Sequence, residues 1–246
     1  MTGLFVQHVY KIVDDVYSIV KDINLQAREQ DRIVITGPAD SGQATILSMI
    51  AGLEDVSNGD IYIGEQKINN INPKDRKVAL IRANYAMYPE MTVYENLAFG
   101  LKLRKYPEEE IRERVQNAAV LLNWEDILMK DIGEISEFQK QMIALGRAVV
   151  KEPEVYLLDE PFACLDDSPR QKAMEEVIRL QKMVNKPFVF ATRYPEDALT
   201  FGTEIIVLKD GEVQQIGTPE ELTKKPADAF VADFFGVSAP IHCKIS

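Results

Sequence analysis

Short apolar stretches alternate with polar turns along the chain and predict an α/β fold. Apolar and polar positions alternate over residues 4–13 and 16–25, which predicts two antiparallel strands, and the mostly apolar stretch 32–36 predicts a buried strand. Helical spacing follows over 44–53, and residues 59–68 have the pattern of a β-hairpin. The first part of the chain is therefore expected to combine two kinds of strand with one helix.

Long helical patterns replace these strands from about residue 90 to 150. One of them begins at Pro107 and has glutamates at the next three positions, where carboxylates favour the positive end of the helix dipole. We interpret this stretch as a helical subdomain inserted into a sheet domain.

Apolar runs return after the helical stretch, at 155–161, 187–193 and 205–211, and a helical pattern over 168–184 separates the first two. Runs of this kind are typical of parallel strands that are buried on both faces. The alternation of strand and helix, without an internal repeat, predicts a parallel sheet.

Residues 37–45, GPADSGQAT, have the glycine spacing of a phosphate-binding loop directly after a predicted strand. In the intact pattern G-x-x-x-x-G-K-[ST], backbone N–H groups cradle the phosphates, the lysine reaches the β and γ oxygens, and the hydroxyl binds magnesium. Gln43 stands at the lysine position and Ala44 at the hydroxyl position. The candidate nucleotide-binding residues in this loop are Gly37, Asp40, Ser41, Gly42, Gln43, Ala44 and Thr45.

A second candidate site lies at the end of the apolar run 155–161. Asp159 could hold magnesium, and Glu160 could orient an attacking water in phosphoryl transfer. The same two acids could instead cap the helix that follows. Their position downstream of the glycine-rich loop favours the phosphoryl-transfer interpretation.

Composition argues against several classes of protein. The formal net charge of -11 and the pI near 4.8 would repel a polyanion, so we expect no nucleic-acid partner. The two cysteines, Cys164 and Cys243, lie far apart in sequence and lack metal-ligand spacing, which favours a reducing compartment and argues against a zinc site. Because no apolar run approaches the ~20 residues that cross a bilayer, we expect a cytoplasmic protein or one held at a membrane by a partner.

Four further stretches carry a resemblance to a known family. They are 84–105 (NYAMYPEMTVYENLAFGLKLRK), 143–155 (IALGRAVVKEPEV), 157–166 (LLDEPFACLD) and 207–222 (VLKDGEVQQIGTPEEL). Together with the glycine spacing of residues 37–45, these stretches make the chain similar to the ATP-binding subunits of ABC transporters, over roughly residues 3–237. The chain is most similar to the maltose-type subunits of sugar importers.

The resemblance implies an α/β fold: a P-loop NTPase (RecA-like) core with an antiparallel β subdomain and an inserted helical subdomain. One cassette domain would span 1–240, with its core in 1–89 and 151–240 and its helical subdomain at about 90–150. Sugar-importer relatives usually continue into a β-rich regulatory domain. Because the chain stops at Ser246, we expect this domain to be absent, either from the protein itself or by truncation.

Several positions depart from the working residues of the family. By resemblance, Ala83 falls on the glutamine that senses magnesium, and Arg193 falls on the switch histidine. The aromatic residue that stacks on adenine corresponds to Val13, with Tyr10 or Tyr17 as alternatives if the register differs. The family's residues are retained at Asp159, Glu160 and Asp166.

The signature loop also departs from the family. Its usual form is Leu-Ser-Gly-Gly-Gln, and it contacts the γ-phosphate of the opposite subunit. Here residues 135–139 read ISEFQ, so Ser136 and Gln139 are kept as candidate nucleotide-binding residues. Glu137 would direct a carboxylate towards the γ-phosphate, and Phe138 adds bulk where backbone must approach closely.

These departures predict that ATP with magnesium binds weakly or not at all. Loss of the lysine removes a positive charge beside the phosphates, and Asp40 adds a negative charge where the family has a small residue. At an effective dielectric constant of ~20, a pair of unit charges ~4 Å apart is worth on the order of 4 kcal/mol. The two changes together could therefore weaken triphosphate binding by several powers of ten.

Arg193 is a candidate replacement cation. Two neighbouring carboxylates need a cation or one of them takes up a proton, so we expect Arg193 to pair with Asp159 or Glu160. The alternative is a solvated turn residue.

A docking surface for a membrane partner is implied by the resemblance. In the family, the groove between core and helical subdomain receives a short helix from each permease subunit, and here it is bordered by Tyr85, Met87, Tyr88, Pro89 and Met91. Aromatic and methionine side chains suit docking because they offer large and adaptable apolar area. The alternative is that they form local core of the subdomain.

We expect from these features a degenerate, non-catalytic ATP-binding-cassette subunit of a membrane importer for a sugar or related solute, with Glu160 idle as a base. It would dock to integral-membrane permease subunits, pair with an identical or different ABC subunit, and lie peripherally on the inner face of the cell membrane. Two alternatives stay open. One is an active ATPase in which Arg193 or Lys140 supplies the missing cation, and the other is a regulatory or interaction protein derived from an ABC domain.

Overall fold

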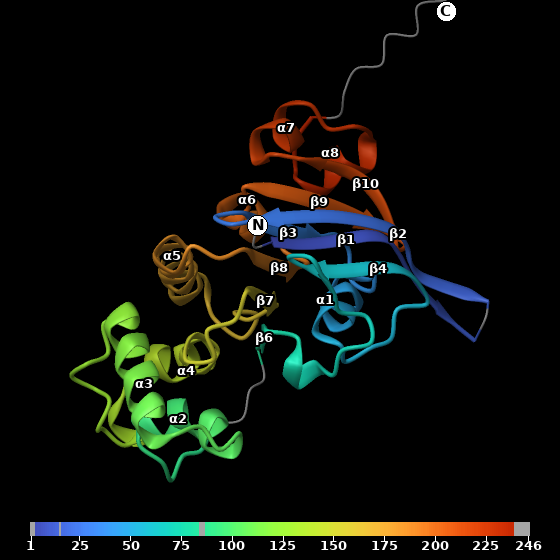
Figure 1. The fold of residues 1–246 in the computed structure, drawn as a ribbon. Coiled ribbons are helices and arrows are strands. Elements are labelled where there is room, and N and C mark those ends of the chain that lie inside the picture. The colour runs from blue at the N-terminus through green and yellow to red at the C-terminus, as the bar shows by residue number, and fades with distance from the viewer. Residues whose placement is uncertain (1–2, 15, 84–86, 239–246) are drawn as a thin grey trace, which may run out of the picture.

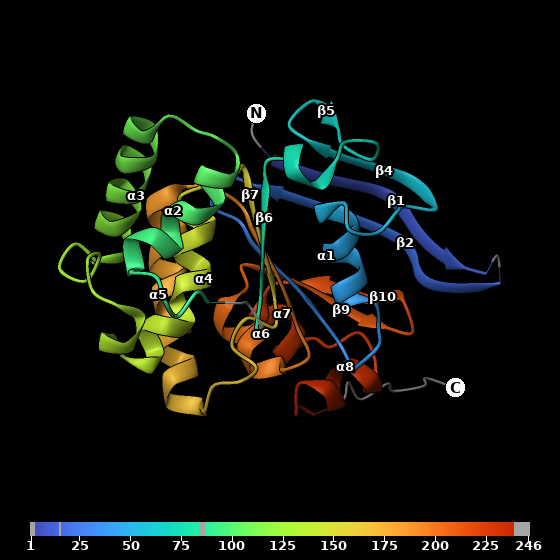
Figure 2. The ribbon, with the colours of Figure 1, turned by 90° about the horizontal axis from the view of Figure 1, so that it is seen from below.

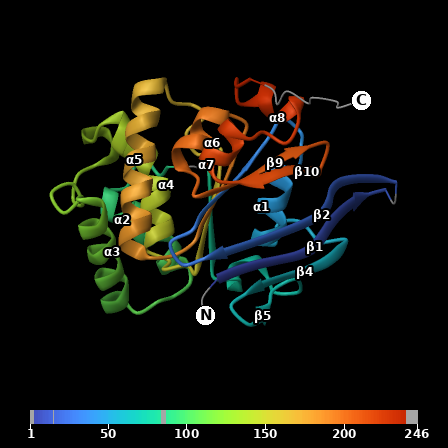
Figure 3. The same cartoon turned by 90° about the horizontal axis from the view of Figure 1, so that it is seen from above.

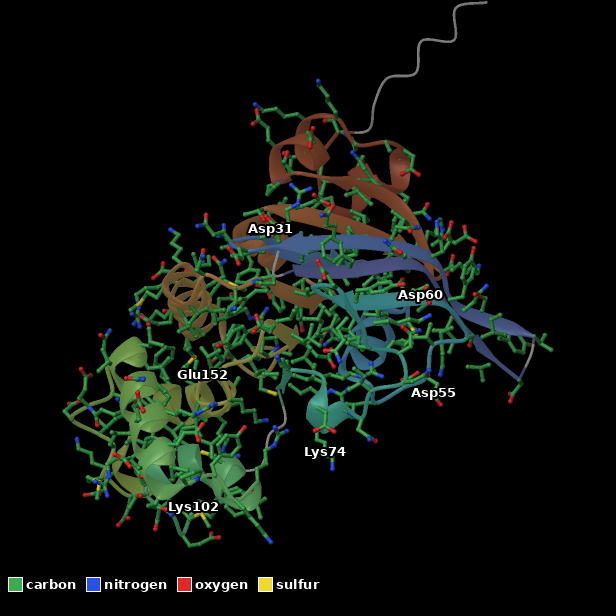
Figure 4. All side chains as sticks on the ribbon, viewed as in Figure 1. Asp31, Asp55, Asp60, Lys74, Lys102 and Glu152 are labelled. Atoms are coloured by element: carbon green, nitrogen blue, oxygen red, sulfur yellow. The ribbon has the colours of Figure 1, made fainter. Side chains whose placement is uncertain are left out.

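The computed structural model describes residues 3–14, 16–83 and 87–238, apart from the side chains of Glu137 and Gln141. Two sheets and a group of helices make up the fold (Figure 1). Charged side chains lie on the outside of both the sheet region and the helical region, as Figure 4 shows for Lys74, Lys102 and Glu152.

The larger sheet has six strands in the order β10-β9-β3-β8-β7-β6. These are β3 (Arg32–Thr36), β6 (Val78–Arg82), β7 (Val155–Asp159), β8 (Phe188–Thr192), β9 (Glu204–Lys209) and β10 (Glu212–Gly217). The strands run parallel except for β10, which pairs antiparallel with β9. The parallel strands expected from the apolar runs are confirmed, and β8 is buried along its whole length. The antiparallel edge strand was not expected.

The smaller sheet is antiparallel, with the order β2-β1-β4-β5. Its strands are β1 (Gly3–Val13), β2 (Tyr17–Arg28), β4 (Asn58–Ile63) and β5 (Gln66–Lys67). Both expected hairpins are confirmed, since β1 pairs with β2 and β4 pairs with β5.

Helix α1 (Gln43–Ala51) lies between the two sheets (Figure 2). Its side chains Ile46, Leu47, Met49 and Ile50 are all buried in the core that both sheets share with it. A helix enclosed in this way needs apolar residues around its whole circumference, which explains the sequence that follows the glycine-rich loop.

A buried arginine closes the end of α1. Gly52 is its C-cap with a left-handed backbone, and a Cβ there would lie 2.4 Å from Arg76 Nε. The Arg76 guanidinium donates to four carbonyl oxygens, those of Met49 (2.7 Å), Ile50 (3.2 Å), Asn69 (2.8 Å) and Ile71 (2.8 Å). Arg76 therefore binds carbonyl oxygens at the helix end and in the loop that packs beside it.

The remaining large helices lie on the face of the larger sheet that is turned away from the smaller sheet (Figure 3). They are α2 (Val93–Leu103), α3 (Glu108–Leu122), α4 (Glu137–Val149) and α5 (Asp167–Val184). Their apolar side chains join one continuous core with that face of the sheet. As expected, α3 begins after Pro107. The limits given for a helical subdomain stay a prediction.

Short elements complete the chain: η1 (Pro73–Asp75), η2 (Ile132–Glu134), α6 (Pro195–Phe201), α7 (Pro219–Lys224) and α8 (Ala229–Phe234). None of the helices in the described ranges is both long and apolar enough to cross a bilayer.

Candidate functional site

A cleft of about 580 Å³ opens at the carboxyl end of the larger sheet. Parallel strands end at a common edge, so the loops that follow β3, β6, β7 and β8 converge there. The lining residues are Ala39, Asp40, Gln43, Ala44, Arg82, Ala83, Asp159, Glu160, Ala191, Thr192 and Arg193. The cleft thus unites the glycine-rich loop with the acid pair and with Arg193, as the sequence predicted.

The loop between β3 and α1 keeps its glycines for steric reasons. A Cβ at Gly37 would come within 2.1 Å of the Leu208 carbonyl oxygen. Gly42 is the N-cap of α1 with a left-handed backbone (φ 97), and Asp40 also has positive φ (63). Gly37, Ser41 and Gly42 of the loop, and Thr45 of α1, are not among the residues that line the cleft. Their predicted role in nucleotide binding stays a prediction.

Gln43 is turned into the loop that precedes it. Its Nε2 donates to the carbonyl oxygens of Gly37 at 2.8 Å and Pro38 at 3.0 Å, and the residue is 9% exposed. Both amide hydrogens are therefore used to hold the loop to itself. At the position where the intact loop has a lysine, this side chain offers no positive charge.

Arg82 binds Asp159 across the ladder between β6 and β7. The two residues are paired in the parallel register, and Arg82 Nε lies 3.1 Å from Asp159 Oδ2. Arg82 Nη2 also donates to Ser48 Oγ of α1 at 2.9 Å. Sequence reasoning gave Arg82 no role; the signal available was a cation at the end of one strand pattern and an acid at the end of another.

Arg193 pairs with Glu160 rather than with Asp159. Its Nε lies 3.6 Å from Glu160 Oε1, and its Nη2 donates to the Tyr194 hydroxyl at 3.1 Å. The hydrogen bond to Tyr194 and the charge of Glu160 raise the pKa of Arg193. Each acid of the pair thus has its own arginine, and Arg193 is not a freely solvated turn residue.

Comparison with known proteins assigns this fold and cleft to a family. The profile of the ABC transporter family matches residues 20–163, which is more than half of the chain. The chain belongs to the ABC transporter family. The resemblance read from the motifs is therefore confirmed.

Two relatives illustrate how far the similarity extends. The oligosaccharides import ATP-binding protein MsmX of Bacillus subtilis (strain 168) is 43% identical over 97% of this chain and 66% of its own length. The sn-glycerol-3-phosphate import ATP-binding protein UgpC of Yersinia pseudotuberculosis serotype I is 41% identical over 97% of this chain and 67% of its own. The chain spans about two thirds of the length of the curated relatives it matches.

Solved ATP-binding cassettes share the architecture. MJ1267 in its ADP conformation superposes with a TM-score of 0.82 at 20% identity, covering 97% of this chain and all (100%) of that one. The cbiO1 protein of Clostridium perfringens, part of the transporter complex cbiONQ, gives a TM-score of 0.82 at 25% identity with 91% of each chain covered. The expected P-loop NTPase fold class is confirmed.

The side chains of this cassette depart from the chemistry of the family's cofactor, which is ATP with Mg²⁺. Gln43 provides no charge for the β and γ oxygens, and Ala44 provides no oxygen for the metal. Asp159 is already engaged by Arg82. Residues 43 and 44 therefore supply neither the positive charge nor the hydroxyl that the intact loop offers to a magnesium nucleotide.

The signature loop of the cassette lies away from this cleft. Ser136 and Gln139 form a capping box at the start of α4: Ser136 Oγ accepts from the Gln139 N–H at 3.2 Å, and Gln139 Oε1 accepts from the Ser136 N–H at 2.9 Å. With Phe138 they line a second cavity of about 330 Å³ beside Trp124. The Glu137 side chain is outside the description. The role of this loop towards a partner's nucleotide stays a prediction.

The candidate docking residues are held by α2 and α4. Tyr88 packs on Phe99 with ring centroids 4.3 Å apart, and the Arg147 guanidinium lies 4.6 Å from the Tyr88 ring centroid. Met87 and Met91 are half-buried, and Met87 packs on the helical core. Tyr85 lies outside the described residues. Docking surface and local core are both compatible with this partial burial.

Proposed function

We propose that this chain is the ATP-binding-cassette subunit of a membrane importer for a sugar or related solute. Similarity over 97% of the chain to proteins named for oligosaccharide import and for sn-glycerol-3-phosphate import supports the substrate class. The subunit would dock to integral-membrane permease subunits, pair with a second ABC subunit, and lie on the inner face of the cell membrane. Its net charge of -11 disfavours a nucleic-acid partner.

We propose further that the subunit holds ATP weakly or not at all and does not hydrolyse it alone. The observation that carries this proposal is the inward hydrogen bonding of Gln43 to the carbonyl oxygens of its own loop. A neutral amide whose hydrogens are both donated to loop carbonyls does not offer a donor or a charge to a phosphate. Asp40 also adds a negative charge to the cleft. A unit charge ~4 Å from a phosphate oxygen is worth on the order of 4 kcal/mol at an effective dielectric constant of ~20, so the deficit is large.

A second candidate function is an active ATPase that uses non-standard side chains. The names of the relatives favour it, since they are ATP-binding proteins of importers. Asp159 and Glu160 are present, and Arg193 lies beside Glu160. In this candidate Arg193 or Lys140 would supply the charge that Gln43 lacks.

Equilibrium binding of ATP, with and without Mg²⁺, separates the two candidates. We expect no saturation of the purified wild-type chain at millimolar ATP. The double variant Gln43→Lys/Ala44→Ser should bind at least about tenfold more tightly and should depend on Mg²⁺, because it restores the charge and the metal ligand. The matched control is Lys182→Gln, at an exposed position of helix α5, and it should leave ATP binding unchanged. Micromolar binding to the wild type would favour the active ATPase instead.

A further inference from the structure

Arg82 presents a positive charge to Asp159 in the cleft that both residues line together with the glycine-rich loop. Arg82 Nε lies 3.1 Å from Asp159 Oδ2, and the Asp159 side chain is 14% exposed. The contact is directed by the sheet, because Arg82 and Asp159 are register partners in the ladder between β6 and β7. It therefore does not depend on a mobile loop.

The second arm of the same guanidinium reaches α1. Arg82 Nη2 donates to Ser48 Oγ at 2.9 Å, and Ser48 is a buried residue of that helix. One side chain thus joins the helix behind the glycine-rich loop, the end of β6 and the end of β7. Only an arginine offers several donors on a rigid plane that can reach two acceptors at once.

We propose that Arg82 is a built-in cation that takes the place of a divalent metal at Asp159 and links α1 to β7 without any ligand. This inference deepens the proposed function because it concerns the same cleft. The proposed function concerns the binding of nucleotide, whereas this inference concerns the binding of a metal ion without nucleotide.

Charge balance in the cleft supports the inference. The lining residues include three acids, Asp40, Asp159 and Glu160, and two arginines, Arg82 and Arg193. A divalent ion at Asp159 would lie within a few ångströms of the Arg82 guanidinium and would compete with it for the same oxygen. Arg193 is a weaker candidate for this role, since its contact with Glu160 is longer, 3.6 Å against 3.1 Å for Arg82 with Asp159.

The test is a titration of the purified full chain with Mn²⁺ alone, followed by electron paramagnetic resonance of the free ion. We expect the wild type to show no Mn²⁺ binding that depends on Asp159, and Arg82→Gln to bind Mn²⁺ at least about tenfold more tightly than the wild type. Adding Asp159→Asn to Arg82→Gln should abolish that gain. Arg112→Gln, an exposed arginine of α3, is the matched control and should behave as wild type.

A second measurement separates two effects of Arg82: the positive charge that it places beside Asp159, and the connection that it makes between α1 and β7. Thermal unfolding of Arg82→Gln should occur at a lower temperature than that of the wild type and should be partly restored by millimolar Mg²⁺, whereas the wild-type midpoint should not respond to Mg²⁺. Arg82→Lys should still exclude Mn²⁺ but lose stability, because lysine cannot bind Ser48 and Asp159 together.

Two results would overturn the inference. One is Mn²⁺ binding to the wild type that is lost in Asp159→Asn, which needs no altered arginine and so does not depend on the folding of a variant. The other is an equal gain in Arg82→Gln and Arg193→Gln, which would make the effect one of general cleft charge. ATP binding to a wild type that still excludes Mn²⁺ would contradict the proposed function and leave this inference standing.

Discussion

Arg147 Nη2 donates a hydrogen bond of 2.6 Å to the amide oxygen of Asn96. Asn96 is fully buried, and its side chain accepts from the Tyr88 N–H at 3.1 Å and donates to the Tyr88 carbonyl oxygen at 3.0 Å. Helix α4, which begins at the signature loop, is thereby joined through two side chains to the segment proposed to dock on the permease. A rigid connection of this kind can carry motion between the two surfaces.

Replacing Asn96 by alanine should destabilise the chain by about 1–3 kcal/mol, because the partly buried backbone groups of Tyr88 lose their partner. Urea unfolding measures the change in free energy, and hydrogen exchange should show faster exchange at Tyr88. Asn117→Ala, at an exposed position of α3, is the matched control and should cost almost nothing. Equal stability of the two variants would contradict a structural role for Asn96.

Replacing Arg76 by methionine should lower the free energy of unfolding by about 3 kcal/mol or more. Burial lowers the pKa of Arg76, yet the buried guanidinium is stabilised because it donates to four carbonyl oxygens, two at the end of α1 and two in the loop beside it. Arg76→Lys should lose almost as much, since an ammonium group cannot reach all four. Arg112→Met on the surface of α3 is the control in the same urea titration. A change below about 1 kcal/mol at Arg76 would show that the cap is dispensable.

The contribution of Asp197 to stability should fall as pH rises above the ordinary pKa of a carboxyl group, about 4. Burial is the main reason why the pKa of Asp197 is raised, although Arg170 at 3.8 Å opposes the shift. In this window the folded chain binds more protons than the unfolded chain, so deprotonation costs folding free energy. Asp197→Asn should flatten this part of the pH profile in urea titrations. A variant profile with the wild-type slope would contradict the assignment.

Replacing Tyr88 and Met91 together by aspartate should release most of the chain from the membrane fraction of cells that express the whole transporter. Two carboxylates would place charge on a surface whose docking depends on apolar contact. Tyr17→Asp, on the exposed end of β2, is the control and should stay with the membrane. Full retention of the double variant would indicate that these residues belong to the local core.

The positions of the cleft residues were predictable from the sequence wherever a strand pattern ended in a chemical group. Asp159 and Glu160 follow an apolar run, and Gln43 follows the glycine frame, so their meeting at one sheet edge could be foreseen. Arg82 could not be assigned in the same way. Arg82 meets Asp159 only because β6 lies next to β7 in a register that pairs the two residues. The local pattern of apolar residues predicts strands but does not predict which strands are neighbours.

The motifs also could not predict which way the side chains point. The sequence marks Gln43 as a missing charge but does not show that its amide turns inward to the loop carbonyls. The motif treats Ser136 and Gln139 as groups for a partner's nucleotide, whereas in the folded chain each satisfies the backbone of the other. In both cases a short-range hydrogen bond competes with the ligand, and only the backbone geometry decides between them.

Steady-state ATP hydrolysis by the purified chain, in Mg²⁺ buffer and without partner subunits, tests the central claim most directly. A cleft without a cation at position 43, with its acids held by Arg82 and Arg193, should give a rate at background level that does not change in Glu160→Gln. Turnover well above background in the wild type, abolished by Glu160→Gln, would contradict the proposal that this cassette is non-catalytic.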